Sequence, residues 1–243
     1  MNRSGSVSGN AIVTGLFALL FELVGTIFLT YTISASGNNP TAVILVLILF
    51  NLIGYRISAA HFNPAITFAA LFRRHSGRFE KKIAILYILF QCAGAFAGAL
   101  FAWLEYGTVW RLAVAQGDKK IFQALLMEII GTFTYVLIYM ISTDKSTKLT
   151  QDDMLNSTVM AIGLGVSIIW GIGVSGGCFN PAIGLFLNLV KLFDTGRGEE
   201  LKYVWIYLIF PFVGAFLSVI FHEFVFRNAL EAKGEENEAK PNE

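Results

Sequence analysis

The amino-acid sequence predicts an all-α membrane protein with six transmembrane helices and two re-entrant half-helices that enter the membrane without crossing it. Hydrophobic residues make up 55% of the 243 residues and charged residues only 14%, which is too apolar for an ordinary soluble domain. Apolar stretches of two lengths recur along the chain, some long enough to span a bilayer and some too short. The sequence also contains an internal repeat, which predicts two related halves.

Six long apolar stretches predict the spanning helices, because a helix needs about 20 predominantly apolar residues to cross a bilayer. These stretches are residues 12–34, 41–57, 83–104, 121–142, 154–174 and 203–226. The first is longer than the apolar region of a signal peptide, so we expect it to be retained as a helix. An even number of spans places both termini on one side of the membrane.

Two shorter apolar segments, residues 63–72 and 180–190, predict the half-helices. Ten helical residues cover about 15 Å, roughly half of a hydrocarbon core about 30 Å thick. Each segment opens with the tripeptide Asn-Pro-Ala, in which asparagine is a favoured N-cap and proline suits the first helical position. The two motifs are Asn63, Pro64 and Ala65, and Asn180, Pro181 and Ala182.

The internal repeat predicts how the two halves are oriented. "ALLFELVGT" at residues 18–26 corresponds to "ALLMEIIGT" at residues 124–132. The halves, about 11–104 and 121–226, each hold three spans, so the second half enters the membrane from the opposite side and the pair forms an inverted repeat. The two half-helices should therefore approach each other from opposite sides.

Basic residues predict the orientation, because basic loops tend to stay in the cytoplasm. With Arg56 left uncounted, eleven lie on the side of the termini: Arg3, Arg73, Arg74, Arg78, Lys81, Lys82, Lys145, Lys148, Arg227, Lys233 and Lys240. Six lie on the other side: Arg111, Lys119, Lys120, Lys191, Arg197 and Lys202. We expect a cytoplasmic tail at 1–10, a membrane domain at 11–226 and a disordered cytoplasmic tail at 227–243.

The meeting of two half-helices predicts a polar path inside the membrane. Each helix N-terminus carries about half a positive elementary charge, which repels cations and protons. The amides of Asn63 and Asn180 can donate hydrogen bonds, and the carbonyls of residues 59–61 and 176–178 can accept them. Such an arrangement suits neutral solutes that form hydrogen bonds.

These motifs, together with their companions, resemble the aquaporin, or major intrinsic protein, family over residues 11–226. The companions are "FELVGT", "MEIIGT", His61 before the first motif, "QCAGAFAG", "SGG" before the second motif, and "PFVGAF". The resemblance implies an aquaporin-like fold, usually a homotetramer with one pore in each subunit. It also implies that Glu22 and Glu128 support the re-entrant loops from beside the pore and that His61 lines the water path.

The resemblance further implies a selectivity filter, on which this chain departs from the family. By spacing from the motifs, the filter positions are Val43, Ile168, Gly177 and Ile183, with Gly176 and Cys178 beside them. Most members carry arginine where this chain has Ile183. The loss of arginine widens the opening for larger neutral solutes, whereas an apolar ring gives water no partner and can close by dewetting. The diameter decides between these effects, and both remain open at this point.

The expected function is a passive channel for water and small uncharged solutes, without cofactor. The formal net charge of +1 gives no basic field for nucleic acid, and the sequence shows no catalytic or metal-ligand pattern. One alternative is a poorly conducting junctional or structural protein of the same fold, suggested by the apolar filter. A second is a leaky ion channel, suggested by the missing arginine. We expect His222, near the end of the last span, to be an interfacial side chain.

Overall fold

The computed structural model describes residues 4–74, 79–148 and 150–239, and within them the chain is helical without strands. The helices are α1 Ser4–Ala35, α2 Pro40–Ser58, α3 Pro64–Ala70, α4 Lys81–Tyr106, α5 Ile121–Thr143, α6 Asp153–Gly171, α7 Pro181–Thr195, α8 Val204–Ile220 and α9 Arg227–Ala239. Short 3₁₀ turns cover Gly117–Lys120 and Gly198–Leu201, and a π-helical turn, Phe221–Phe226, joins α8 to α9. Among the described residues, six helical regions are long and apolar enough to cross a membrane, which confirms the predicted spans.

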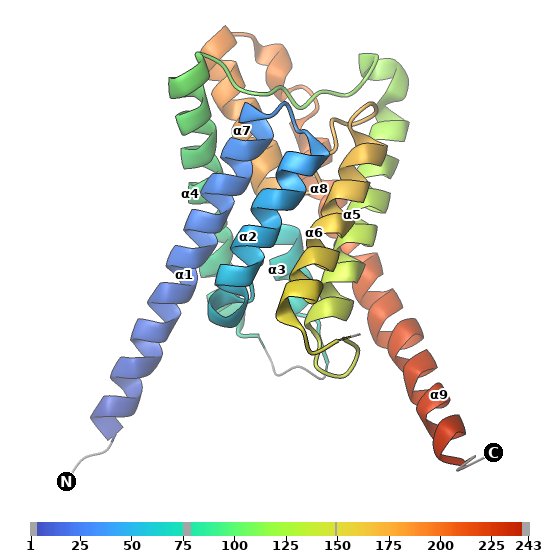
Figure 1. The fold of residues 1–243 in the computed structure, drawn as a ribbon. Coiled ribbons are helices and arrows are strands. Elements are labelled where there is room, and N and C mark those ends of the chain that lie inside the picture. The colour runs from blue at the N-terminus through green and yellow to red at the C-terminus, as the bar shows by residue number, and fades with distance from the viewer. Residues whose placement is uncertain (1–3, 75–78, 149, 240–243) are drawn as a thin grey trace.

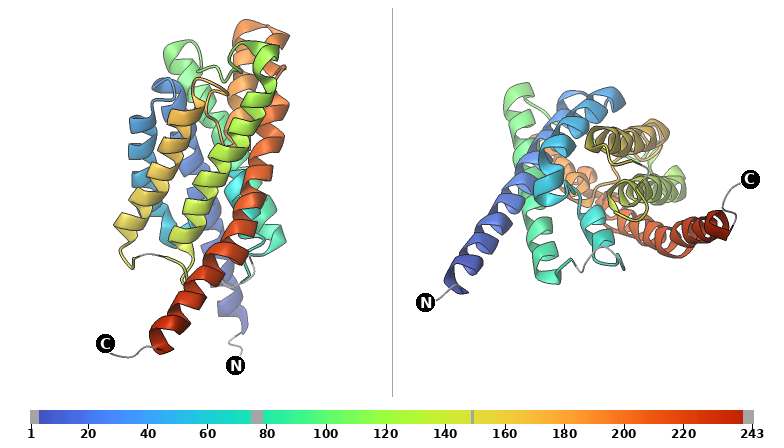
Figure 2. Two further views of the ribbon diagram at one scale, coloured as in Figure 1. Left: turned by 90° about the vertical axis from the view of Figure 1, so that its right-hand side faces the viewer. Right: turned by 60° about the horizontal axis from the view of Figure 1, so that its bottom comes forward.

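Helix α1 begins and α9 ends at the same end of the molecule, here called the terminal face (Figures 1 and 2). The turn between α5 and α6 lies at this face too, whereas the connection from α4 to α5 runs over the opposite face (Figure 1). Half-helix α3 lies toward the terminal face and α7 toward the opposite face. The two half-helices contact each other, so the inverted arrangement predicted from the repeat is present.

Local sequence signals explain where several helices begin and end. The side chain of Asn39 caps α2 by accepting hydrogen bonds from the backbone N–H groups of Thr41 and Ala42, and Pro40 takes the first helical position. The side chain of Asp152 caps α6 in the same way. Such caps satisfy backbone donors that have no partner within the helix.

Glycines allow the helices of each half to pack closely. A Cβ atom added at Gly94 or Gly98 of α4 would lie 2.5 or 2.3 Å from a backbone oxygen of α1. In the second half, a Cβ at Gly214 of α8 would lie 2.4 Å from the Ile129 carbonyl oxygen of α5. The repeat therefore builds two equivalent helix pairs, α1 with α4 and α5 with α8, around the half-helices.

Three boundaries differ from the sequence-based expectations. Helix α7 is longer than the expected 180–190 segment, because Leu192 and Phe193 continue it and the helix ends only at Thr195, where Gly196 takes a left-handed conformation. Helix α1 starts at Ser4, ahead of its apolar part. Residues 227–239 were expected to be a disordered tail, yet they form α9, since alanine, leucine, glutamate and lysine extend the preceding helix;. Arg3, Arg78 and Lys240, counted for the orientation, lie outside the described residues.

Candidate functional site: the meeting point of the half-helices

Each Asn-Pro-Ala motif starts a half-helix with the same cap. Asn63 is extended, with φ −156° and ψ 123°, and its Oδ1 accepts a hydrogen bond from the Ala65 N–H at 2.8 Å. Asn180 is likewise extended, and its Oδ1 accepts from the Ala182 N–H at 3.1 Å. The proline that follows each asparagine takes the first helical position, where no N–H is needed.

The two asparagines also join the half-helices to each other. The Nδ2 of Asn63 donates to the backbone carbonyl of Phe179 at 2.8 Å, and the Nδ2 of Asn180 donates to that of Phe62 at 2.9 Å. Both phenylalanines have positive φ, 50° at Phe62 and 53° at Phe179, a region rarely used by bulky residues. An amide NH₂ has two hydrogens, so each asparagine keeps one donor after this contact.

Each phenylalanine before a motif fills a space that a glycine leaves open. A Cβ added at Gly25 would lie 2.2 Å from Cε1 of Phe62, and one added at Gly131 would lie 2.1 Å from Cε1 of Phe179. These are the glycines of the repeated E-x-x-G-T sequence. In each copy of the repeat, the glutamate accepts hydrogen bonds from the loop backbone, and the glycine leaves space for the phenylalanine ring.

Glu22, on α1, holds the loop that precedes the first motif. It is fully buried, and its carboxylate accepts hydrogen bonds from the N–H groups of His61 and Phe62 at 2.9 and 2.7 Å. The Ser58 hydroxyl and the Gln91 amide donate to it at 2.6 and 2.7 Å. Four donors around one carboxylate fix the loop in place.

Glu128, on α5, has the same role before the second motif. Its carboxylate is fully buried and accepts hydrogen bonds from the N–H groups of Cys178 and Phe179 at 3.1 and 2.8 Å, and from the Ser175 hydroxyl at 2.7 Å. The Cys178 thiol donates to the Asn180 carbonyl at 3.1 Å. The Glu128 carboxylate therefore holds the loop before the second motif through backbone donors, as Glu22 holds the first;.

The four predicted filter residues are all buried in the packed interior. Val43 is 0% exposed, Ile168 and Ile183 are each 1% exposed, and all three belong to one contiguous apolar cluster. Gly177 has φ +66°, and a Cβ there would meet the Ile168 backbone at 3.3 Å. The structure thus places Gly177 against Ile168 and buries all four positions, which leaves almost none of their side-chain surface accessible to water.

Asn38 is a polar residue beside the filter that the sequence analysis missed. It is fully buried in the turn between α1 and α2, and its Nδ2 donates to the carbonyls of Gly176 at 2.8 Å and Gly177 at 3.2 Å. Two backbone carbonyls of the second loop therefore each already accept one hydrogen bond from the protein. Within the described residues its Oδ1 has no hydrogen-bond partner. No local motif distinguishes Asn38, because its partners lie 138 and 139 residues away.

His61 lies in an aromatic cluster on the terminal-face side of the first motif. Its Nδ1 is 3.0 Å from the Thr67 hydroxyl. The rings of Phe79, Tyr87 and Tyr139 lie 5.4, 5.3 and 5.7 Å from the imidazole, between ring centres. The Tyr139 hydroxyl also donates to the Ala59 carbonyl at 2.7 Å. One of the carbonyls expected to face the path is therefore already paired.

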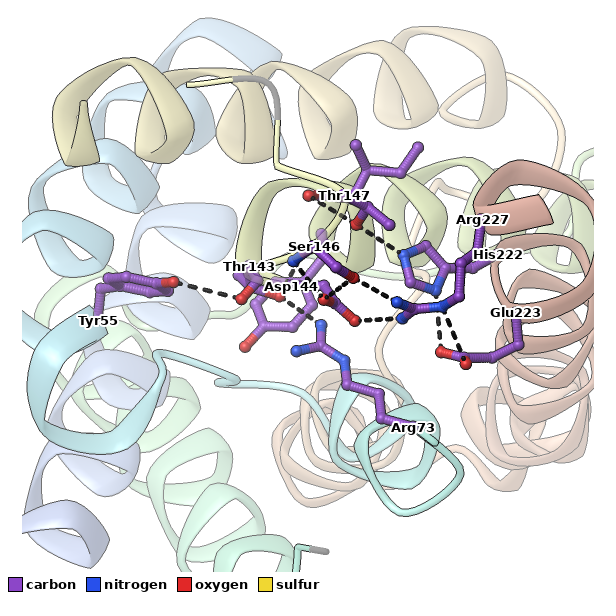
Figure 3. A network of polar contacts seen from close by, with 11 residues as sticks. Tyr55, Arg73, Thr143, Asp144, Ser146, Thr147, His222, Glu223 and Arg227 are labelled. Atoms are coloured by element: carbon purple, nitrogen blue, oxygen red, sulfur yellow. Dashed lines mark hydrogen bonds and ion pairs between the residues drawn. The ribbon is translucent and has the colours of Figure 1, made fainter. Parts of the chain in front are cut away.

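A cluster of ligand-type side chains lies at the terminal face, away from the motifs. One ligand atom from each of Asp144, His222 and Glu223 lies within 4.8 Å of the others. Arg227 occupies this cluster, with Nη2 2.6 Å from the Asp144 carboxylate and Nε 3.5 Å from that of Glu223 (Figure 3). A guanidinium already supplies the positive charge, so these residues do not suit a metal ion.

His222 was expected at the membrane interface, and this expectation is wrong. The side chain is fully buried, with Nε2 3.0 Å from the Thr147 hydroxyl and Nδ1 3.0 Å from the Glu223 carboxylate. Hydropathy alone does not indicate which side of a terminal helix turn faces the protein.

Comparison with known proteins identifies relatives along most of the chain. Residues 40–222 match the family described as Major intrinsic protein. Aquaporin-1 of Homo sapiens is 30% identical over 207 residues, which cover 78% of this chain and 71% of that protein. The probable aquaporin PIP2-8 of Oryza sativa subsp. japonica is 30% identical over 181 residues, covering 71% and 63%.

Two further comparisons extend this set. The glycerol uptake facilitator protein of Bacillus subtilis (strain 168) is 31% identical over 186 residues, covering 70% of this chain and 65% of that protein. The chain thus matches slightly less than two thirds of the Bacillus and rice proteins. The X-ray structure of the aquaglyceroporin from Plasmodium falciparum has the same fold, with a TM-score of 0.76 at 18% identity, covering 90% of this chain and 99% of that chain.

Proposed function

The chain belongs to the major intrinsic protein family, and from this premise we propose that water and small uncharged solutes pass between its two Asn-Pro-Ala motifs. Family membership makes the chain an integral, multi-pass membrane channel for water or small solutes, and not an enzyme. The route through the motifs, the range of solutes and the residues that select them are the proposal. Transport is passive and follows the solute gradient.

The paired contacts between asparagine side chains and opposing loop carbonyls carry this proposal. Asn63 and Asn180 each use one amide hydrogen to reach the other half of the protein, which leaves the second hydrogen for a passing oxygen atom. The positive ends of α3 and α7 meet at the same point, so cations and protons are disfavoured there. Neutral molecules that form hydrogen bonds are the class that this arrangement accepts.

Two consequences of the missing arginine were left open, a widened opening and a narrow apolar constriction. The packing of the filter residues favours the narrow constriction. Val43, Ile168 and Ile183 are almost fully buried, and all three belong to the same apolar core cluster. We infer that water crosses when this ring separates slightly, and that the ring closes by dewetting when the side chains return. A filter that closes in this way favours water over larger solutes. The same burial of the filter side chains also favours one alternative function, that of a poorly conducting structural protein.

We further propose that the terminal face is cytoplasmic and that four copies assemble into a homotetramer. The excess of basic residues on this side supports the orientation. Residues 1–10 and 227–243 are then cytoplasmic segments that flank the channel domain 11–226. Apolar side chains on the outside of the helices, such as Leu45 at 63% and Phe101 at 51% exposed, suit contact with lipid or with neighbouring subunits.

Osmotic swelling of proteoliposomes in a stopped-flow instrument tests the proposed function. We expect water permeability well above that of empty vesicles, with an activation energy close to that of water diffusing through a pore. Permeability equal to that of empty vesicles would favour the structural alternative. Currents of small cations under voltage clamp in the same preparation would favour the ion-channel alternative.

A further inference from the structure

Arg73 lies at the terminal face, just after the end of the first half-helix. It follows α3, and its Nη2 donates a hydrogen bond to the Thr143 hydroxyl at the end of α5 (Figure 3). Its Cζ lies 5.5 Å from the centre of the Tyr139 ring. The guanidinium therefore lies on the face of an aromatic ring and forms a cation–π contact with it.

Tyr139 connects this charge to the approach of the first motif. Its ring is 2% exposed and meets the His61 ring edge-on, with centres 5.7 Å apart. Its hydroxyl bonds the Ala59 carbonyl at 2.7 Å. Arg73 thus lies one aromatic side chain away from the loop that leads to Asn63.

Arg73 also has access to the terminal face and an unused donor. It lines a pocket of about 810 Å³ together with Arg74, Phe79 and Lys81, among others, and Phe79 reaches the His61 ring at 5.4 Å. Within the described residues the buried Nε of Arg73 has no hydrogen-bond partner. The Nε itself is enclosed, but the guanidinium carries five N–H hydrogens, of which the contact with Thr143 uses one. Arg73 is only partly buried, so its terminal nitrogens keep hydrogens that a water molecule or a solute oxygen in this pocket can accept.

The anchor that holds Arg73 is itself fixed. The Thr143 hydroxyl donates to the Tyr139 carbonyl at 2.8 Å, which leaves its oxygen to accept from Arg73. The next residue, Asp144, is bound to Arg227 at 2.6 Å and to the Ser146 N–H at 2.9 Å. The turn after α5 is therefore held from the start of α9, and the guanidinium has a defined position.

Building on the proposed channel function, we propose that Arg73 is a second selectivity residue, placed at the terminal-face mouth of the path. Its guanidinium repels cations and donates hydrogen bonds to permeating neutral molecules. It supplies, at this mouth, the positive charge that Ile183 does not provide at the filter. Charge selection and size selection are then divided between the two ends of the path, with Arg73 at one and the apolar ring at the other.

Arg74 provides a matched control, because it has the same charge one residue further along the chain. Its Cζ lies 5.1 Å from the centre of the Phe224 ring, on the π-helical turn after α8, and its side chain is exposed. Removal of either arginine lowers the charge of the terminal face equally. Only removal of Arg73 takes the charge away from Tyr139 and His61.

The test compares Arg73→Gln, Arg73→Lys and Arg74→Gln with the wild type in proteoliposomes, after size-exclusion chromatography and circular dichroism have shown that all four are folded. Water flux is measured by stopped-flow swelling, and potassium flux by a fluorescent indicator in the vesicles. We expect Arg73→Gln to raise the ratio of potassium to water flux about tenfold or more, the effect of one unit charge at close range in a partly buried site. Arg73→Lys and Arg74→Gln should stay within about twofold of the wild type, since a charge remains near Tyr139 in both.

Two failures of this experiment have different meanings. Equal potassium-to-water flux ratios in Arg73→Gln and Arg74→Gln would overturn the proposed role of Arg73. Arg73 would then act only as one of several charges on the terminal face. Wild-type water flux no higher than that of empty vesicles would overturn the proposed channel function, whatever the arginine variants do.

Discussion

Asn63 and Phe179 are joined by a hydrogen bond of 2.8 Å between a side-chain amide and a backbone carbonyl 116 residues away. Asn180 and Phe62 form the same bond in the reverse direction at 2.9 Å. Each asparagine also caps its own half-helix. One residue type therefore starts the helix, binds the other half of the repeat and leaves one donor for a solute.

Replacement of either asparagine by alanine should weaken both stability and transport. Asn63→Ala and Asn180→Ala each lose a cap and a cross-loop hydrogen bond, so we expect losses of about 1–3 kcal/mol each in the free energy of unfolding. Water permeability per folded protein should fall as well. Thermal unfolding in detergent and stopped-flow swelling measure the two effects.

Asn188→Ala is the matched control for these variants. Asn188 is equally buried, but in the described part of the chain the one hydrogen bond of its amide goes to the Gly184 carbonyl within α7, at 2.8 Å. We expect its water permeability to match the wild type. If Asn188→Ala lowered permeability as much as the motif variants, loss of packing alone would explain all three.

The contact between Gly25 and Phe62 predicts that a single methyl group is harmful at this position. Gly25→Ala would place its Cβ 2.2 Å from the Phe62 ring, and overpacking of this kind costs about 1–3 kcal/mol. Gly15→Ala, on the same helix, has no atom within 4 Å of the added Cβ and should gain up to about 1 kcal/mol from helix propensity.

Thermal unfolding of the two glycine variants in detergent gives the comparison. The double variant Gly25→Ala with Phe62→Leu should recover part of the lost stability, since a smaller side chain makes room for the methyl group. Equal unfolding temperatures for Gly25→Ala and Gly15→Ala would contradict the predicted clash.

The apolar ring at the filter predicts that removal of one side chain opens the path. Ile168, which we place in the proposed ring, is 1% exposed, so Ile168→Ala should raise water permeability several-fold and admit glycerol. Ile169→Ala removes the same atoms from a side chain that is 59% exposed on the outside of α6, and it should change neither flux. Swelling assays with water and glycerol gradients decide the matter, and a fall in permeability in Ile168→Ala would argue against the ring as the constriction.

The spans and half-helices could be predicted because their signals are local. Apolar stretches of two lengths, and proline after an asparagine cap, report on length and helix start without knowledge of the partners. The repeat added the inverted arrangement, and the structure bears out this fold class. The equivalence of Glu22 and Glu128 was also visible in the repeat, although the donors that surround them were not.

The features that sequence reasoning missed depend on contacts between distant residues. Asn38 reaches carbonyls 138 and 139 residues away, and nothing near it in the chain marks the contact. The fit of Phe62 against Gly25 requires the loop to be folded onto α1. His222 was misplaced because its partner Thr147 lies 75 residues earlier. The polar sequence after residue 226 suggested a disordered tail. Residues with high helix propensity instead extend the last span into α9.

The ion pair between Asp144 and Arg227 predicts a pH dependence of stability. Burial opposes ionisation of Asp144, but hydrogen bonds from Ser146 and the Arg227 guanidinium outweigh it and lower the pKa of this carboxyl below its ordinary value. A carboxyl with a lowered pKa in the folded state stabilises the protein above its unfolded pKa of about 3.9, and this contribution is lost as the pH falls through the folded value.

Asp144→Asn should therefore be less stable than the wild type at pH 7, and the difference should shrink as the pH falls below about 4. The loss should be smaller than the roughly 3–5 kcal/mol expected for an isolated buried pair, because Arg227 keeps Glu223 at 3.5 Å. Asp153→Asn removes an exposed pair with Arg56, which is worth about 0–1 kcal/mol. Thermal unfolding from pH 3 to 7 compares the three proteins, and a constant gap between Asp144→Asn and the wild type across this range would show that ionisation of Asp144 does not stabilise the turn.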